Sequence, residues 1–139
     1  MMKINHIGIV VSDIQRALHT YINEYGYQQI SEILTIENQL VRVVLLNCGN
    51  DVNVELIEPV SEDSPVATAL KRGGGINHIC YETTEFDNKY ETFKNKVVRP
   101  PKPAPEVYFK GGRTFFIFRK GELVEFLELT KSEDKTHEH

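Results

Sequence analysis

The tetrapeptide Ile4-Asn5-His6-Ile7 recurs as Ile76-Asn77-His78-Ile79, and this repetition decides the fold of the 139-residue chain. Near the end of each half, Val54-Glu55-Leu56-Ile57 is echoed by Val124-Glu125-Phe126-Leu127. With the spacing of the first repeat, residues after each copy also match in character: Ser12 with Thr84, Ile14 with Phe86, Leu18 with Tyr90, and Tyr21 with Phe93. A repeated sequence indicates a repeated supersecondary unit, so the chain is expected to contain two similar modules.

Each half has the pattern of a β-α-β-β-β module. In the first half, a β-branched strand at residues 4–11 precedes a helix whose apolar residues recur every three or four positions. Ser12 and Gln15 have the spacing of a capping box at the helix start, and Gly26 is placed to end the helix. Further strands are expected at residues 27–35, 40–46 and 52–57. The second half predicts a strand at 75–81, a helix at 86–95, and strands at 97–98, 113–118 and 123–129.

The predicted fold class is α+β, with two βαβββ modules forming a curved, barrel-like mixed sheet. We expect a single domain over residues 1–139, divided into module one (3–60), a linker helix (61–74), module two (75–130) and a polar tail (131–139). Ser64-Pro65 has the pattern of an N-cap followed by proline at the first helical position, which predicts the start of the linker helix.

Composition and charge narrow the function classes. Hydrophobic residues make up 40% of the chain, which is enough to fill a core. The net charge of −4 comes from interspersed acids and bases, so we expect no nucleic-acid partner. Two cysteines do not form a disulfide framework or a thiolate zinc site. No apolar run approaches the roughly 20 residues that cross a bilayer, and no leader pattern precedes the first strand; we expect a cytoplasmic protein with no membrane partner.

Four residues of the repeat are candidate metal ligands. Side chains alternate across a strand, so each repeated histidine lies on the face opposite its apolar neighbours, and each repeated glutamate lies in an apolar strand where an uncompensated carboxylate is costly. Taken singly, such residues are usually structural or solvated. Their duplication in register favours ligation, since a structural repeat does not require repeated polar residues. Two imidazoles and two carboxylates suit one divalent Zn, Mn, Co, Ni or Fe ion, with ligands His6, Glu55, His78 and Glu125.

Other polar residues receive less specific interpretations. Glu58 and Glu128 fall on the opposite strand face and are expected to be solvated, as are His19 on the first helix and the tail histidines His137 and His139. Cys80 shares the face of His78 and either borders the site or fills the core. Four cations are either ordinary surface charges or contacts for a substrate phosphate or carboxylate: Lys71, Arg72, Lys110 and Arg113.

These motifs resemble the vicinal oxygen chelate superfamily, which includes glyoxalase I, bleomycin resistance proteins and extradiol dioxygenases. The resemblance covers about residues 3–130. The stretch Val54-Glu55-Leu56-Ile57-Glu58-Pro59, and the segment from Ser64-Pro65 to Gly75-Ile76-Asn77-His78-Ile79, are most similar to methylmalonyl-CoA epimerase-like proteins. The chain departs from that pattern where Asn77-His78 replaces the usual His-His pair, and in the proline-rich segment 99–113.

The resemblance implies a metal-dependent isomerase or lyase that moves a proton next to a carbonyl of a chelated small molecule, with an acyl-CoA as a candidate substrate. In that reading Glu125 is both a metal ligand and the base, and Glu37 is the nearest candidate for a second catalytic acid or base. A homodimer is expected from exposed sheet edges. The alternatives are a glyoxalase-like lactoylglutathione lyase and a small-molecule binding or resistance protein. A dioxygenase is disfavoured, since such iron sites have two histidines and one carboxylate.

Overall fold

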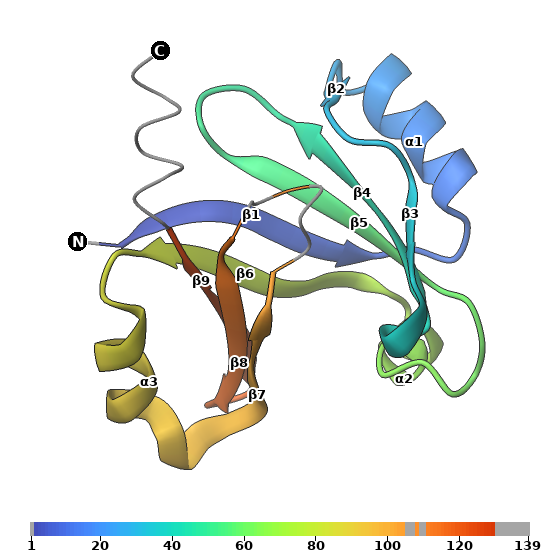
Figure 1. The fold of residues 1–139 in the computed structure, drawn as a ribbon. Coiled ribbons are helices and arrows are strands. Elements are labelled where there is room, and N and C mark those ends of the chain that lie inside the picture. The colour runs from blue at the N-terminus through green and yellow to red at the C-terminus, as the bar shows by residue number, and fades with distance from the viewer. Residues whose placement is uncertain (1, 105–107, 109–110, 130–139) are drawn as a thin grey trace. The chain divides into compact units, whose positions relative to one another are not determined.

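The computed structural model describes residues 2–104, 108 and 111–129. The chain divides into two compact units. The first-half unit comprises His6–Asn77, and the second-half unit comprises Met1–Asn5 together with His78–His139. Each unit is described by itself below, and Figure 1 labels the elements of both.

The first-half unit is built on strands that pair around β5. Strand β1 (Lys3–Val10) runs parallel to β5 (Asn53–Pro59), and β5 pairs antiparallel with β4 (Val41–Asn47). The expected strand at residues 27–35 is instead two short strands that both pair with β4: β2 (Gln28–Gln29) and β3 (Leu34–Ile36). The remaining elements are helix α1 (Ile14–Asn23), the 3-10 turn η1 (Glu37–Gln39) and helix α2 (Ala67–Lys71).

The second-half unit repeats this topology. Its elements are β6 (Gly75–Thr83), α3 (Phe86–Phe93), the 3-10 turn η2 (Lys94–Lys96), β7 (Val97–Pro103), β8 (Arg113–Arg119) and β9 (Glu122–Glu128). Strand β6 runs parallel to β9, β9 pairs antiparallel with β8, and β8 pairs antiparallel with β7. The first and last strands of each module are therefore parallel neighbours, and the predicted fold class with two βαβββ modules is confirmed.

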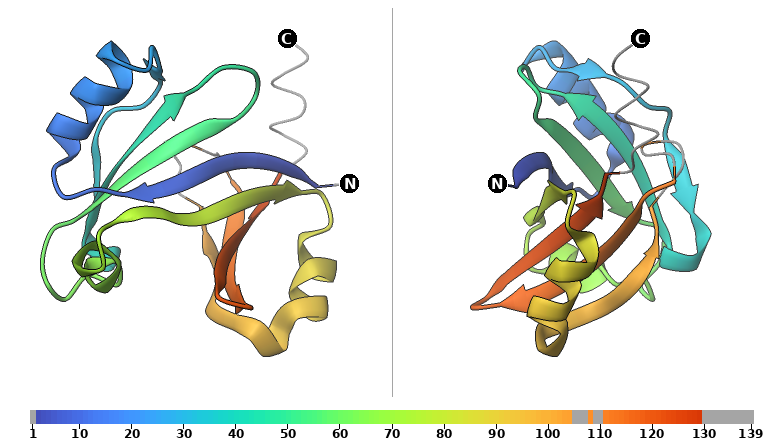
Figure 2. Two further views of the ribbon diagram at one scale, coloured as in Figure 1. Left: turned by 180° about the vertical axis from the view of Figure 1, so that it is seen from behind. Right: turned by 60° about the vertical axis from the view of Figure 1, so that its left-hand side comes forward.

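The register of these parallel pairs is the same in both modules. Ile7 lies opposite Val54 in the first, and Ile79 lies opposite Val124 in the second. Since side chains alternate across a strand, the repeated histidines and glutamates of a module fall on one face. The other face packs under a helix, α1 in the first-half unit and α3 in the second (Figures 1 and 2). We call the histidine-bearing face the site face and the other the helix face.

Apolar side chains fill the helix face of each module. In the first-half unit, Ile14 and Leu18 of α1 pack on the strand residues Val44, Leu46, Val54 and Leu56. In the second-half unit, the cluster is aromatic, with Phe86 of α3 packed on Phe115, Ile117 and Phe126. Burying each such side chain contributes roughly 1.5–3 kcal/mol, so these two clusters hold each helix on its sheet.

The start of α1 differs from the predicted capping box. Asp13, rather than Ser12, is the N-cap, and its carboxylate accepts hydrogen bonds from the backbone N–H groups of Gln15 and Arg16. Gly26 has a φ of +75°, and the next residue, Tyr27, donates its N–H to the carbonyl oxygen of Tyr21. This left-handed turn ends the helix as the glycine position predicts.

The glutamates expected to be solvated are ion-paired instead. Glu58 lies on the helix face, as predicted, but is only 6% exposed; it accepts the N–H of Ile14 at the start of α1 at 2.9 Å and pairs with Arg42 of β4. In the second-half unit, Glu128 accepts two hydrogen bonds from Arg113 of β8, at 3.0 and 2.7 Å. The repeat therefore duplicates an Arg–Glu pair that was not predicted from the sequence, because an arginine on the neighbouring strand gives no local signal.

Two other elements begin or end elsewhere than expected. Helix α2 starts at Ala67, and Ser64 instead accepts the N–H of Val66 in the preceding turn. Strand β7 extends to Pro103, although its prolines argue against a strand. It tolerates them because, among the described residues, it pairs only with β8.

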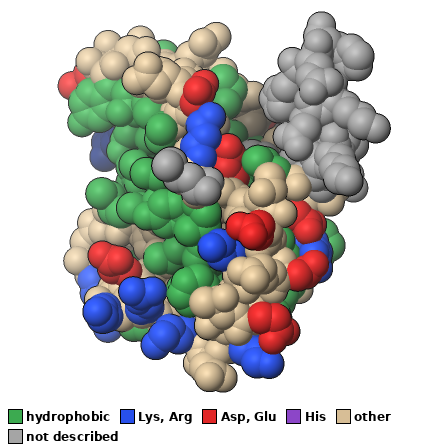
Figure 3. Space-filling model, turned by 90° about the vertical axis from the view of Figure 1, so that its left-hand side faces the viewer, with side chains coloured by type: hydrophobic (Ala, Val, Ile, Leu, Met, Phe, Trp, Pro, Cys, Tyr) green, Lys and Arg blue, Asp and Glu red, His purple; other side chains and the backbone are tan. Residues whose placement is uncertain are grey.

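Among the described residues, no helix is long and apolar enough to cross a bilayer. On the face drawn in Figure 3, acidic and basic side chains are interspersed.

We predict that Glu58→Ala lowers the free energy of unfolding by about 2–3 kcal/mol, because it leaves a helix N–H and a guanidinium without their shared acceptor. Urea denaturation followed by circular dichroism measures the change. Glu91→Ala is the control, since Glu91 pairs with Lys94 on an exposed surface and should leave stability unchanged. Equal stabilities of Glu58→Ala and wild type would contradict the anchoring role of Glu58.

Candidate metal centre

The first-half unit carries one His–Glu pair on its site face. His6 lies opposite Asn53, and Glu55 lies opposite Gly8 two residues further on, so the two side chains are diagonal neighbours on β1 and β5. His6 is 2% exposed, and its Nε2 atom lies 3.6 Å from Oε1 of Glu55. Gly8 adds no side chain between them, which leaves the carboxylate free to reach the imidazole.

The second-half unit carries the matching pair. Glu125 lies opposite Cys80 of β6, two residues after His78, and Nε2 of His78 lies 3.1 Å from Oε1 of Glu125. The hydroxyl of Thr114 donates a 2.6 Å hydrogen bond to the other carboxylate oxygen. The ring of Phe116 lies edge-on to His78, with centroids 5.2 Å apart. The imidazole and the carboxylate are therefore both held in place by β8.

The geometry of each pair fits two ligands of one cation. Bonds of about 2.1 Å to a divalent ion, at angles between octahedral and tetrahedral, place two donor atoms about 3.0–3.4 Å apart. The observed distances of 3.6 Å for His6–Glu55 and 3.1 Å for His78–Glu125 lie close to this range. Imidazole nitrogen and carboxylate oxygen are also a donor set that suits borderline divalent ions. Each unit therefore presents His and Glu groups that can bind a metal.

Thr114 and Phe116 are the site residues that the sequence reading missed. The strand that carries them was predicted from the sequence, but its register was not. That register pairs Phe116 with Glu125 and Thr114 with Leu127. The alternation of Thr114, Phe116 and Phe118 along β8 was the available signal, since it places a threonine on the same face as an aromatic residue. A threonine in a strand gives no distinctive signal in the sequence, because its hydrogen-bond acceptor, here the carboxylate of Glu125, lies on a neighbouring strand.

The structure assigns surroundings to the remaining candidates. Glu37 is exposed in the turn η1, which joins β3 to β4. His19 is exposed, as expected, and Cys80 is fully buried beside Leu127 and Ala104. Arg113 is engaged by Glu128 and Asp87, so an ordinary ion pair, and not a substrate phosphate, accounts for it. Lys110, His137 and His139 lie outside the described residues.

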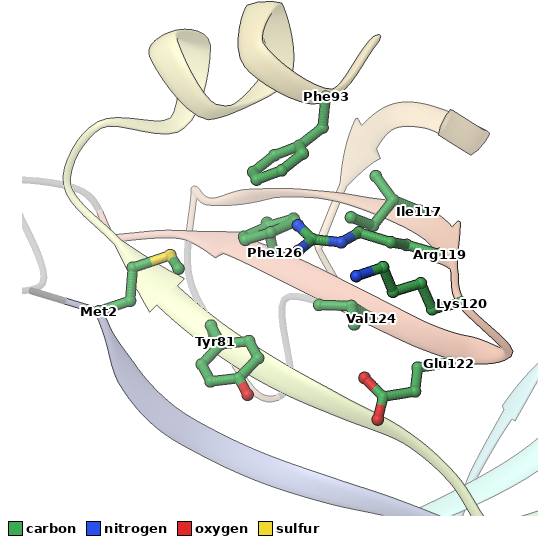
Figure 4. Close-up of a pocket in the computed structure, with 9 residues that line it drawn as sticks. All are labelled: Met2, Tyr81, Phe93, Ile117, Arg119, Lys120, Glu122, Val124 and Phe126. Atoms are coloured by element: carbon green, nitrogen blue, oxygen red, sulfur yellow. The ribbon is translucent and has the colours of Figure 1, made fainter. Parts of the chain in front are cut away.

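A cavity of about 370 Å³ lies on the helix face of the second-half unit, away from its His–Glu pair. Its floor includes Tyr81, Val124 and Phe126, which point to the opposite side of their strands from His78 and Glu125 (Figure 4). Phe93 of α3 covers it, and Arg119 and Glu122 are among its lining residues. This cavity therefore does not belong to the candidate metal centre.

A paired βαβββ architecture in which each module offers one His–Glu pair defines a class of metal-binding fold. Residues 5–117 match the family model described as the Glyoxalase/Bleomycin resistance protein/Dioxygenase superfamily. The chain belongs to this superfamily.

Several of the individual relatives are named epimerases. The mitochondrial methylmalonyl-CoA epimerase of Homo sapiens is 33% identical over 128 residues, covering 88% of this chain and 72% of the relative. A variant of Streptomyces coelicolor methylmalonyl-CoA epimerase, solved in complex with 2-nitronate-propionyl-CoA, matches with a TM-score of 0.79 and 27% identity over 94% of this chain and 96% of that one. The uncharacterized protein YqjC of Bacillus subtilis is 32% identical, over 99% of this chain and 100% of its own length.

These comparisons confirm the resemblance inferred from the sequence. They also confirm the expectation of an enzyme of the isomerase or lyase type, since the named relatives are epimerases, which are isomerases. The expected small-molecule substrate is supported by a solved relative in complex with an acyl-CoA compound. The ligand assignment of the four residues and the homodimer stay predictions.

We predict that Thr114→Val weakens divalent metal binding about 10- to 100-fold while leaving the fold intact, because the carboxylate of Glu125 loses the hydrogen bond that orients it. Isothermal titration with Zn²⁺ or Co²⁺ measures the affinity, and circular dichroism checks the fold. Thr35→Val on β3 is the control, because Thr35 is exposed and far from either pair in the strand register. Unchanged affinity in Thr114→Val would show that this hydrogen bond does not prepare a ligand.

Proposed function

We propose that the protein is a metal-dependent epimerase of a 2-carboxyacyl thioester, with methylmalonyl-CoA as the leading candidate substrate. The observation that carries the proposal is the duplicated His–Glu pair, held in the same strand register in both modules. The names of the relatives supply the substrate class.

We further propose that His6, Glu55, His78 and Glu125 bind a single ion. Two protein ligands leave most of the coordination sphere of Zn²⁺ or Co²⁺ to water, which makes for weak binding, whereas catalytic sites commonly use at least three. Neither unit alone supplies a third ligand of the repeated pattern. If both pairs bind one ion, all four side chains act as ligands, and two coordination positions of the ion stay open for substrate oxygens.

The chemistry of such an epimerase is proton removal from the carbon between a carboxylate and a thioester. A bound divalent cation acts as a Lewis acid that stabilises negative charge developing on the substrate oxygens. Glu125 accepts the α-proton in this proposal. One of its oxygens lies beside His78 and the other is fixed by Thr114, so the carboxylate is held in one orientation. A positioned base of this kind contributes roughly 10²–10⁴-fold to the rate.

Inversion needs a second group that delivers a proton to the opposite side of the substrate's α-carbon, and Glu37 is the residue proposed for this role. It is an exposed carboxylate next to Ile36, which pairs with Val41 on the face of the first-half sheet that also bears Glu55. Arg42 of the adjoining strand β4 is paired with Glu58 on the helix face. Arg42 therefore does not neutralise the charge of Glu37.

We expect one divalent ion per chain, measured by elemental analysis after dialysis against Zn²⁺ or Co²⁺. His6→Ala and His78→Ala should each abolish stoichiometric binding, because each removes a ligand of the same ion. His19→Ala is the matched control on an exposed helix position and should bind as wild type does. Two ions per chain, each lost in only one histidine variant, would show that the pairs act separately and would contradict a shared centre.

We expect the metal-loaded protein to exchange the α-proton of methylmalonyl-CoA with solvent deuterium, because Glu125 can remove it and return a deuteron. Glu125→Gln should abolish exchange. Glu37→Gln should retain exchange from one enantiomer but lose inversion, since only the second proton donor is missing. Mass spectrometry follows the label and circular dichroism of the thioester follows the stereochemistry.

Because Glu125 is also a proposed ligand, metal content must be measured in Glu125→Gln alongside activity. Loss of exchange with metal retained supports a base, whereas parallel loss of both supports only a ligand. Turnover of a glutathione hemithioacetal with no exchange of any acyl-CoA would overturn the epimerase assignment in favour of a glyoxalase-like lyase. Sedimentation under the same conditions tests the expected homodimer.

A further inference from the structure

Strand β7 places two basic side chains on the site face of the second-half unit. Arg99 lies opposite Phe116 and Lys102 lies opposite Thr114, so both share the face of Glu125. Residues three apart on a regular strand would point to opposite faces. The pairing with β8 shifts between these two residues, across Pro100-Pro101, and this bulge brings the second cation onto the face of the first.

Both cations are partly withdrawn from water. The guanidinium of Arg99 lies over the ring of Phe116, 4.6 Å from its centroid. Burial lowers the pKa of Arg99, and the negative charge of Glu125 opposes this effect. Burial also lowers the pKa of Lys102, as does the positive charge of Arg99, again opposed by Glu125. The two cations thus lie close enough to repel one another and to sense the carboxylate of the metal pair.

Among the described residues, neither cation has an ion-paired carboxylate of its own. Within residues 2–104, 108 and 111–129, no carboxylate forms an ion pair or a hydrogen bond with Arg99 or Lys102. Other arginines of the chain show the contrast, since Arg42 and Arg113 are each bound to a glutamate. Two adjacent, partly desolvated cations that share only the nearby charge of Glu125 are unfavourable, and the arrangement becomes more favourable when a bound anion supplies further negative charge.

We propose that Arg99 and Lys102 form an oxyanion-binding subsite that receives a carboxylate or a phosphate of the thioester substrate. The proposal rests on the proposed function for the identity of the ligand. Phe116 orients the planar guanidinium, which suits it to bind two oxygens of one anion, and Lys102 adds a point charge beside it. Phe116 also contacts the ring of His78, so the subsite borders the metal pair of its own unit.

Binding of three thioesters to the metal-loaded full chain, measured by calorimetry, tests the subsite and identifies the anion. Methylmalonyl-CoA carries both a carboxylate and phosphates, propionyl-CoA carries phosphates alone, and the methylmalonyl thioester of pantetheine carries the carboxylate alone. Arg99→Met and Lys102→Met should each weaken methylmalonyl-CoA binding about 10- to 100-fold. Weaker binding of the pantetheine thioester identifies the carboxylate, and weaker binding of propionyl-CoA identifies a phosphate.

Lys96→Met is the matched control, because Lys96 is an exposed lysine in the turn just before β7 and should bind all three compounds as wild type does. Arg99→Lys keeps the charge and loses the planar group, so it should weaken binding less than Arg99→Met. Each variant should still bind the metal ion and should melt at the wild-type temperature. A variant that has lost metal or fold is replaced in the comparison by the single substitution at the other position.

The outcomes separate this proposal from the proposed function. If wild type exchanges the α-proton but both variants bind all three thioesters normally, the subsite is refuted and the epimerase assignment stands. If wild type binds the thioesters and the variants do not, yet no exchange occurs, the subsite is supported and the epimerase assignment fails. Absence of thioester binding in wild type refutes both.

Discussion

Parallel pairing between the first and last strands of each module is the constraint on which the rest of the structure depends. It brings together a histidine and a glutamate that are far apart in the chain, with Ile7 opposite Val54 in one module and Ile79 opposite Val124 in the other. A shift of one residue in either register would turn one member of the pair toward the helix face. The apolar packing of α1 and α3 resists this, since such a shift would bury polar groups under a helix.

The same alternation gives glutamates three residues apart opposite roles. In β5, Glu55 faces the imidazole of His6, whereas Glu58 binds Arg42 and the first N–H of α1. In β9, Glu125 and Glu128 divide in the same way. Glu58 ties α1 to β5 directly through charge-assisted hydrogen bonds, which are stronger than neutral ones. Glu128 binds Arg113, which in turn pairs with Asp87 of α3. The position of the candidate ligands is thus supported from the reverse side of their own strands.

The features of this structure that could be predicted from the sequence are those that arise from recognisable sequence patterns. Features that depend on contacts between strands could not be predicted. The repeat, the alternation and the helix periodicity can be recognised in the sequence itself. They were sufficient to predict the fold and to propose four metal ligands, which stay a prediction. The predicted N-cap was wrong by one residue, because Ser12 and Asp13 are both residue types that favour this position and the sequence does not distinguish them. The partners of Glu58 and Glu128, the role of Thr114 and the bulge in β7 depend on strand register, which no local pattern in this chain determines.

The two modules are not equivalent on their site faces, and the difference bears on which glutamate acts as the base. Where β8 places Thr114 and Phe116 across from β9, β4 places Val43 and Leu45 across from β5. Glu55 consequently has aliphatic neighbours on that side, whereas Glu125 has a hydrogen-bond donor and an aromatic ring, with two cations beyond them. A base must be oriented toward its substrate, and the hydrogen bond from Thr114 orients the carboxylate of Glu125, which supports the proposed role of Glu125 in proton transfer.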